Sequence, residues 1–570
     1  MTIQSHREKA NFIWQIADLL RGNYKQSEYG KIILPLTVLR RLDQILEPTK
    51  AKVLQVYDDN KKQKPEILEK LLNKAAKQKF HNRSKFDFKK LAADPNGLEK
   101  NLRNYINGFS AGAKEIFDYF QFEDEIEKLD KENLLYLVIK DFAKQDLSDL
   151  DTMQMGYVFE ELIRKFSELS NETAGEHFTP REVIRLMVDL LFIGDNDILR
   201  KEGIIRTLYD PACGTGGMLS VAEAYVQELN PNARLEVFGQ EINDESYAIC
   251  KGDMLIKGQN PGNIKYGDTF TKDGLENELF DYMLCNPPFG VEWKKQKEVI
   301  EKEHDDRGFA GRFGPGLPRI NDGSLLFLLH MISKMKKDGS RIGIVFNGSP
   351  LFTGSAGSGE SEIRKWIIEN DMLEAIVAMP DQLFYNTGIA TYVWILTNRK
   401  AKKRKGKVQL INAVSFFEKM TRSLGNKRNL ISETQLTSIA KIYGSFKSGE
   451  FCKIFDNEDF GYARITVERP AKDEKGQVLT DKNGNPKADS ELRDYENVPL
   501  TEKIETYFKR EVLPHVPDAW VDESKTKIGY EINFTKYFYQ YKPLRSLSEI
   551  RADILALKKE TEGMIREVIK

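Results

Sequence analysis

The stretch at residues 280–290 reads "FDYMLCNPPFG", an apolar run that ends in a polar turn with two prolines. An apolar run of this kind, bounded by a turn, is typical of a buried strand in a parallel sheet. The turn then lies at the carboxyl end of the strand, where open α/β sheets bind their ligands. The stretch therefore predicts an α/β fold with a site at residues 286–289.

The Asn-Pro-Pro-Phe turn offers two acceptors to a ligand. Pro288 forces Pro287 into an extended conformation, so the Pro287 carbonyl oxygen stays outside any helix. This oxygen and the amide oxygen of Asn286 suit the two hydrogens of an exocyclic amine, whose nitrogen is more nucleophilic when both are held. Phe289 adds a flat face for a planar base. The predicted catalytic residues are Asn286, Pro287, Pro288 and Phe289, unless the turn merely ends the strand.

A second strand leads into a glycine-rich turn. "GIIRTLY" at residues 203–209 continues as "DPACGTGGML" from Asp210. Glycines let the backbone approach a ligand closely, and Asp210 at the strand end can accept from a ligand amine. The spacing fits neither the triphosphate loop G-x-x-x-x-G-K-[ST] nor a clean G-x-G-x-x-G dinucleotide pattern. The predicted cofactor-binding residues here are Asp210, Pro211, Ala212, Gly214, Thr215 and Gly216.

Two further segments complete the predicted cofactor site. "LEVFGQEI" predicts the next strand, with Glu241 at its end, where a carboxylate meets ribose hydroxyls. Upstream, "HFTPREVIRLMVDL" predicts a helix with Thr179 as N-cap and Pro180 as its first residue, and with Glu182 completing a capping box. Helix amino ends attract carboxylates, so His177, Phe178 and Thr179 are predicted contacts; the plain alternative is an ordinary cap.

Taken in this order, these motifs resemble those of the amino-group DNA methyltransferases that use S-adenosyl-L-methionine. Within that family, the chain resembles the modification subunit of type I restriction-modification systems. The shared stretches include "GEHFTPREVIRLMVDL", "DPACGTGGML", "NPPF" and "NGSPLFTGSAGSGESEIRKWII". The resemblance extends over nearly the whole chain, which makes it far more specific than any single motif.

The resemblance implies a Rossmann-like S-adenosylmethionine-dependent methyltransferase sheet with a helical amino-terminal domain and a helical carboxyl-terminal tail. We expect a helical domain at 1–148, a catalytic domain at 149–445, a polar insertion or linker at 446–500 and a helical region that contacts the specificity subunit at 501–570. At 570 residues, the chain is long enough for about two to four domains.

The implied reaction transfers a methyl group from S-adenosyl-L-methionine to N6 of an adenine flipped out of double-stranded DNA. The resemblance adds Glu176 to the cofactor-binding set, and it implies that Asp268 in "KYGDTF" meets the adenine of the cofactor. The enzyme is then a site-specific, adenine-specific DNA methyltransferase. No covalent intermediate and no catalytic cysteine are expected, in contrast to methylation of cytosine at carbon 5.

Three alternatives stay open at this point. Cytosine N4 fits the same two acceptors, although the family variant usually carries serine in place of Asn286. Methylation of a protein glutamine also uses an Asn-Pro-Pro turn, commonly with tyrosine in place of Phe289. The third alternative is a scaffold that binds the cofactor without catalysis, and the joint presence of Asp210, the glycines and Asn286 argues against it.

The amino-acid composition limits which classes of protein are possible. Hydrophobic residues make up 40% and charged residues 30%, as in soluble globular proteins. There is no apolar run of about 18 residues and no signal-like start, so we expect a cytoplasmic protein without a membrane contact. The four cysteines have no C-x-x-C spacing, which argues against a metal site and a disulfide framework.

The formal net charge of −1 is unusual for a protein that binds DNA, because phosphate contacts normally leave a basic footprint. Either the footprint is local, or another subunit carries it. The resemblance implies a separate specificity subunit that reads the DNA sequence, with two modification subunits for each specificity subunit, and a restriction subunit in the full complex. The lysines at residues 50–90 form either a DNA-facing surface or a solvated helical face.

Three segments carry further expectations. The long, charged segment 290–323 contains Arg307, Arg312 and Arg319, and we expect a mobile loop that orders on DNA. His330, on the following helix, is expected to be a packed core residue. From about residue 400 the strand pattern fades: "ITVERPAKDEKGQVLTDKNGNPKADSELRDYENVP" predicts an exposed hairpin or loose insertion, and helices resume at 501.

The carboxyl end predicts a helix that binds a partner. Ser546 and Glu549 have the spacing of a capping box. Apolar residues then alternate at intervals of three and four, which is a narrow coiled-coil seam, whereas a helix on its own globular domain shows a broader stripe. The seam residues are Leu547, Ile550, Ile554, Leu557, Thr561, Met564 and Val568. The resemblance implies that this helix packs against helices of the specificity subunit.

Overall fold

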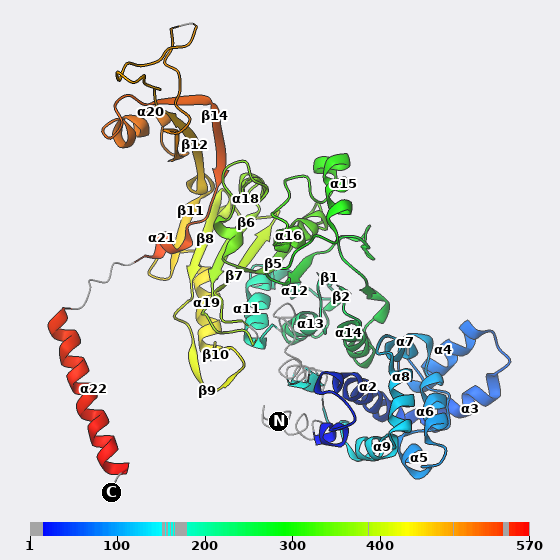
Figure 1. Ribbon diagram of the computed structural model, residues 1–570. Coiled ribbons are helices and arrows are strands. Elements are labelled where there is room, and N and C mark those ends of the chain that lie inside the picture. The colour runs from blue at the N-terminus through cyan, green and yellow to red at the C-terminus, as the bar shows by residue number, and fades with distance from the viewer. Residues whose placement is uncertain are drawn as a thin grey trace. The chain divides into compact units, whose positions relative to one another are not determined.

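The computed structural model describes residues 15–150, 154–155, 158–159, 161–162, 165, 179–385, 387–482, 484–539 and 546–568 (Figure 1). The chain divides into a large unit, Met1–Ile532, and a terminal unit, Asn533–Lys570. The large unit contains a helical amino-terminal region, a nine-stranded sheet, a three-stranded sheet and a two-stranded hairpin. No helix in these described ranges is long and apolar enough to span a membrane.

The amino-terminal region is helical, which confirms the prediction. Its helices are α2 (Gly30–Leu46), α3 (Lys50–Asn60), α4 (Pro65–Ala76), α5 (Phe88–Ala93), α6 (Leu98–Asn107), α7 (Ala111–Tyr119), α8 (Phe122–Lys131) and α9 (Leu135–Lys144). In α2, the side chains of Leu36, Leu39 and Leu42 are fully buried. The region therefore has its own hydrophobic core, which is centred on α2.

The nine-stranded sheet has the order β11-β8-β6-β7-β5-β4-β1-β2-β3. Its strands are β1 (Ile205–Asp210), β2 (Arg234–Glu241), β3 (Ile264–Tyr266), β4 (Tyr282–Cys285), β5 (Arg341–Asn347), β6 (Leu373–Ala378), β7 (Thr391–Thr397), β8 (Lys407–Asn412) and β11 (Cys452–Asp456). Neighbouring strands are parallel except where β7 or β11 takes part. All four residues of β4 are buried, as the opening stretch predicts.

Helices accompany this sheet. They are α11 (Arg181–Phe192), α12 (Asn196–Leu199), α13 (Gly217–Leu229), α14 (Asp244–Ile256), α15 (Lys297–Arg307), α16 (Ser324–Ser333), α17 (Ser349–Phe352), α18 (Gly359–Glu369) and α19 (Glu433–Ser445). Of these, α11, α13, α14, α16, α17 and α19 contact the strands of the sheet directly. Helix α11 contacts α13, α19 and β5, and its apolar side is buried there. The mixed α/β architecture with its helical amino-terminal region confirms the predicted fold class.

The chain changes direction in the sheet between β1 and β4. It leaves β1 to one side through β2 and β3, and it returns on the other side of β1 as β4. Because these strands are parallel, Asp210, Glu241 and Asn286 all lie at or just beyond strand ends on one edge of the sheet. Such a switch point is where doubly wound sheets form ligand crevices.

Helix α14 joins the helical region to the sheet. The ring of Tyr119, on α7, has its centroid 4.6 Å from that of Tyr247 on α14 and 4.8 Å from that of Tyr266 on β3. Beside these rings, the Lys251 ammonium group lies 2.5 Å from a carboxylate oxygen of Glu115. The helical region is therefore fixed against the part of the sheet that follows Glu241.

The structure corrects the expectation that strands fade after residue 400. Strands β8 and β11 extend the large sheet, and β12 (Gly461–Glu468) lies between β13 (Asp494–Pro499) and β14 (Trp520–Tyr530) in the three-stranded sheet. The prediction of helices from 501 is also wrong for β14, although α20 (Ile504–Tyr507) precedes it. The described residues between β12 and β13 form only isolated bridges. The domain boundaries at 148, 445 and 500 stay a prediction.

The sequence signal was weak in this region because each strand pairs with one that is distant along the chain. Burial in β12 is nearly continuous and includes Ile465 and Val467, while β14 carries mostly polar, half-exposed residues. Neither strand has the strict alternation of apolar and polar residues that marks a strand in a sequence.

A buried ion pair connects β5 and β6. Arg341 donates to a carboxylate oxygen of Glu374 at 2.8 Å and to the Leu191 carbonyl at 2.9 Å, and Tyr443 donates to the same carboxylate. Burial acts to raise the pKa of Glu374, but Arg341, Arg404 and the hydrogen bonds outweigh it and lower the pKa to about 2. The stabilisation is therefore present above the unfolded pKa and is lost as the pH falls towards 2.

We expect the substitution Glu374→Gln to destabilise the large unit by about 3–5 kcal/mol at neutral pH, because Arg341 stays buried without a counter-charge. The measurement is the unfolding temperature. The matched control is Glu433→Gln, which removes the exposed pair of Glu433 with Arg185 and should cost at most about 1 kcal/mol. Equal shifts in the two variants would contradict this prediction.

Candidate active site

The predicted site residues converge on one cavity of about 360 Å³. This volume falls in the range of pockets that bind small molecules. The predicted residues that line it are Thr179, Asp210, Pro211, Ala212, Gly214, Thr215, Glu241, Asp268, Asn286 and Pro288. Gly216, Pro287 and Phe289 are adjacent in sequence but do not line the cavity, and Glu176, His177 and Phe178 lie outside the described residues.

The glycine-rich turn wraps closely around the end of β1. Gly214 and Gly216 have φ angles of 53° and 85°, in the left-handed region that favours glycine. A Cβ atom on Gly216 would lie 2.9 Å from the sulfur of Cys250, so no larger residue fits without a shift. Gly216 is also the N-cap of α13. The turn therefore exposes backbone to the cavity and starts a helix directly behind it.

Glu241 ties the end of β2 to the glycine-rich turn. Its carboxylate accepts from the backbone N–H of Gly214 at 2.8 Å, of Ile242 at 2.9 Å and of Asn243 at 2.8 Å. These three backbone donors fix the Glu241 carboxylate in the wall of the cavity.

Asp268 connects β3 to the segment after the catalytic turn. One carboxylate oxygen accepts from the N–H groups of Phe270 at 2.8 Å and Thr271 at 2.9 Å. The other accepts from the side-chain amide of Gln296 at 2.7 Å. Asp268 and Gln296 both line the cavity, so this bond is part of its wall.

Asp210 is buried at the floor of the cavity and accepts from the N–H of Ala212 at 3.0 Å. Burial raises the pKa of its carboxyl group to about 8, the bond from Ala212 opposes this, and the negative charge of Glu241 adds to the increase. The carboxyl group is therefore mostly protonated in the free protein at neutral pH. A cation bound beside it would favour the ionised form.

The side chain of Asn286 is oriented by Thr179. Its NH₂ group donates to the Thr179 hydroxyl at 2.8 Å, which assigns the other side-chain atom as an acceptor. The prediction of Thr179 as the N-cap of a helix is wrong: α11 begins at Arg181, its N-cap is Pro180, and that cap has no side-chain hydrogen bond. The Thr179 hydroxyl bonds to the catalytic turn instead of to its own helix.

Phe289 packs against Phe384, a residue that the sequence interpretation missed. Phe289 is 9% exposed, and the two ring centroids are 6.2 Å apart in an edge-to-face arrangement. Phe384 lies in the loop after β6. Its position beyond a strand end, in "LFYNTG", was the available signal.

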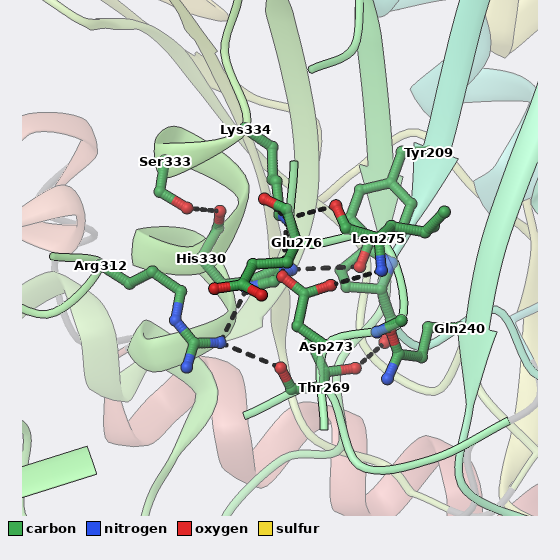
Figure 2. Close-up of polar contacts among 12 residues, drawn as sticks. Tyr209, Gln240, Thr269, Asp273, Leu275, Glu276, Arg312, His330, Ser333 and Lys334 are labelled. Atoms are coloured by element: carbon green, nitrogen blue, oxygen red, sulfur yellow. Dashed lines mark hydrogen bonds and ion pairs between the residues drawn. The ribbon is translucent and has the colours of Figure 1, made fainter. Parts of the chain in front are cut away.

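The segment 290–323 forms part of the cavity wall and contains a helix, which corrects the expectation of a plain loop, whereas its mobility and its ordering on DNA stay a prediction. It contains α15, and its Arg312 binds Glu303 at 2.7 Å and the carbonyl oxygens of Thr269 at 3.0 Å and Phe270 at 2.7 Å. Figure 2 shows Arg312 pointing to Thr269 and His330. The guanidinium group of Arg312 has five N–H donors, so it holds the segment at several points. The glycine-rich composition of the segment does not indicate these contacts.

Further cavity residues escaped the sequence interpretation. They are Phe270, Val291, Trp293, Gln296 and Phe327, among others. Trp293 follows the catalytic turn and donates to the Arg319 carbonyl at 3.0 Å. An isolated tryptophan beside such a turn, within a charged segment, was the signal that could have identified this wall.

His330 is a packed core residue, as predicted. It is fully buried, and its ring lies 3.1 Å from the Tyr209 hydroxyl (Figure 2). Burial and the charge of Arg312 hold its pKa well below the ordinary value. The four cysteines are all buried free thiols.

Two family models match the chain. The model described as N-6 DNA Methylase matches residues 150–470, and the model described as HsdM N-terminal domain matches residues 9–142. The chain belongs to the N-6 DNA methylase family. The predicted family is thereby confirmed, and so is the predicted class of enzyme, an adenine-specific DNA methyltransferase.

Similar proteins agree with this assignment. The type I restriction enzyme MjaIX methylase subunit of Methanocaldococcus jannaschii is 28% identical over 502 residues, which is 83% of each chain. The HindI methylase subunit of Haemophilus influenzae is 31% identical over 262 residues, 45% of this chain and 54% of that protein. These relatives favour N6-adenine methylation over the cytosine and glutamine alternatives.

Among solved structures, a type I restriction-modification methyltransferase subunit from Streptococcus thermophilus has a TM-score of 0.65 at 24% identity. The match covers 80% of this chain and 97% of that one. At this level of identity the likeness supports the fold.

We predict that Asp210→Asn stabilises the free protein at pH 8. The pKa of this carboxyl group is raised from 3.8 to about 8 in the folded protein. As the pH rises between these values, the unfolded chain releases the proton while the folded protein keeps it, so the folded protein loses stability progressively. The gain in unfolding temperature should be largest near pH 8 and should disappear towards pH 4.

Asp281→Asn is the matched control, at the residue just before the neighbouring strand β4. Burial acts to raise the pKa of Asp281, but the bonds from Lys336 and Thr207 outweigh it and lower the pKa. This carboxylate contributes stability above its unfolded pKa, so its removal should lower the unfolding temperature at pH 8. A gain for Asp210→Asn that did not change with pH would refute the assigned cause.

Proposed function

We propose that the cavity binds S-adenosyl-L-methionine and that the turn at residues 286–289 receives the N6 amine of an adenine flipped out of double-stranded DNA. The observation that carries this proposal is that Asn286 lines the same cavity as Asp210, Glu241 and Asp268. Acceptors for a cofactor and acceptors for a substrate amine thus meet at one switch point of the sheet.

The residues around the cavity fit the cofactor. S-adenosyl-L-methionine carries an amine, two ribose hydroxyls and an adenine amine, and the three carboxyl side chains of Asp210, Glu241 and Asp268 can accept from such donors. The side chains of Met218, Phe270 and Phe327 offer apolar surface to a purine ring. When bound, the cofactor supplies an electrophilic methyl group.

The catalytic turn acts on the target amine. The Asn286 amide oxygen and the Pro287 carbonyl oxygen accept its two hydrogens, which directs the nitrogen lone pair away from them. Positive charge develops on that nitrogen during methyl transfer, and the two oxygens stabilise it. The bond to Thr179 keeps the amide oriented, while Phe384 fixes the ring of Phe289 beside the base.

We propose a specificity subunit as the main partner of the chain, with two copies of the chain for each specificity subunit and a restriction subunit in the full complex. The partner helix is α22 (Leu547–Val568) of the terminal unit, which also contains α21 (Phe534–Phe538). The predicted capping box is present: Ser546 N–H donates to Glu549 at 2.9 Å, and Glu549 N–H donates to the Ser546 hydroxyl at 3.2 Å. A cytoplasmic location agrees with these partners.

The first part of the predicted seam of α22, from Leu547 to Leu557, is exposed. Leu547, Ile554 and Leu557 are 85%, 61% and 66% exposed. A row of exposed apolar side chains at these intervals favours burial against another helix.

Asn286→Ala should reduce single-turnover methyl transfer at least about 100-fold, because it removes an acceptor that acts mainly in the transition state. Affinity for the cofactor, measured by calorimetry, should change little. The matched comparison is Asp210→Ala, which should weaken cofactor binding first. Near-normal methylation by Asn286→Ala would refute the role of the turn.

Deletion of residues 546–570 should leave folding and cofactor binding intact but abolish assembly with the specificity subunit. The double substitution of Ile554 and Leu557 by Asp should have the same effect, because each charge would be buried without a partner. The control replaces Ala552 and Ala556 by Asp, on the same helix but outside the seam. If the truncated chain still co-elutes with its partner, the seam does not form the interface.

A further inference from the structure

The antiparallel pair β9 (Glu418–Leu424) and β10 (Lys427–Leu430) forms a separate hairpin, here termed the basic hairpin (Figure 1). Its two-residue turn contains Gly425, with a φ angle of 60°, and Asn426, whose N–H donates to the Tyr385 carbonyl at 2.8 Å. A Cβ atom on Gly425 would lie 2.5 Å from the same oxygen. The turn is therefore held in close contact with the loop after β6.

This loop leads to the catalytic turn. The Gln382 carbonyl accepts from the N–H groups of Arg428 at 2.9 Å and Asn429 at 3.2 Å, and two residues further on Phe384 packs against Phe289. The hairpin is thus attached by its backbone to a segment that supports the catalytic phenylalanine.

A buried lysine provides a second attachment. Lys427 is 4% exposed, forms an ion pair with Glu182 in the first turn of α11, and donates to the Leu383 carbonyl at 2.9 Å. Residue Thr179, just before α11, accepts the hydrogen bond from Asn286. Both attachments of the hairpin therefore connect it to residues that orient the catalytic turn.

The exposed side of the hairpin is basic. Lys419, Arg422 and Arg428 are exposed, and none forms an ion pair within the described part of the chain. The strand register shifts between Lys427 and Asn429, so Arg428 lies opposite the bulged stretch of β9 that includes Arg422. Glu418 is the acid of the hairpin. On a chain of net charge −1, this is a local excess of positive charge beside the active site.

We propose that the basic hairpin binds phosphates of the DNA strand that carries the target adenine. This inference rests on the proposed function. A near-neutral protein that binds DNA needs a local group of basic side chains for the phosphates, and the hairpin provides one. A base can enter the cavity only if its own backbone passes the catalytic turn, and the hairpin is fixed there by Tyr385, Gln382 and Glu182. Arginine suits this task because its planar group matches phosphate oxygens in pairs.

The test uses the complex of the full chain with its specificity subunit and a DNA duplex that carries the recognition site. The variant replaces Arg422 and Arg428 by Gln. We expect the plot of log affinity against log salt concentration to become less steep by about 0.9 for each lost phosphate contact. The KM for DNA should rise, while the affinity for S-adenosyl-L-methionine and the kcat at saturating DNA should stay unchanged.

The matched control replaces Lys441 and Lys447 by Gln. Both are exposed, and they lie near the carboxyl end of α19 and just beyond it. The Tyr443 carbonyl between them accepts from Arg404, which precedes β8, so this region lies at the amino ends of the parallel strands, opposite to the site. The control should keep the original salt dependence. Equal slopes in the variant and the control would overturn the proposal, because net charge and not position would then decide binding.

A second variant, Gly425→Ala, keeps every charge but displaces the turn from Tyr385. We expect it to raise the KM for DNA without loss of folding or of cofactor binding. If the arginine variant fails to co-elute with the specificity subunit, the hairpin is a protein interface and the proposal is wrong. The salt dependence of DNA binding is measured without methyl transfer, so that result stands apart from any failure of the proposed chemistry.

Discussion

The parallel alignment of β1 with β4 is the constraint on which the site depends. Because the chain places β2 and β3 on one side of β1 and returns on the other, the glycine-rich turn and the catalytic turn leave neighbouring strands at the same edge. Glu241 then binds the glycine-rich turn, and Thr179 binds Asn286. The cavity is the space that these two attachments keep open between the strand ends.

The site is built from groups that cost stability. Asp210 is buried with a pKa raised to about 8. Glu374 lies on β6, which β7 and β5 separate from β4, and its arginine partners lower its pKa to about 2. The structural carboxylate is compensated within the protein, and the one at the cavity is not. This difference is expected where a ligand supplies the missing charge.

The sequence predicted those parts of the site that local chemistry determines. Strand-end positions of Asp210, Glu241 and Asn286 follow from apolar runs and turns, and the capping box at Ser546 follows from spacing alone. The sequence did not predict the contacts that depend on a residue far away along the chain. Thr179 bonds to Asn286 rather than to its own helix, Arg312 fixes a segment that reads as a loop, and β12 pairs with strands on both sides.

In the proposed function, one cavity receives both the cofactor and the target amine. A crystal structure of the chain with S-adenosyl-L-homocysteine tests it most directly. We expect the ligand to lie in the cavity between Glu241 and Asp268, with its amino acid end towards Asp210 and its sulfur facing Asn286. Density for the ligand at any other place, or a ligand whose sulfur lies out of reach of the turn at residues 286–289, would show that the cavity does not combine the two sites.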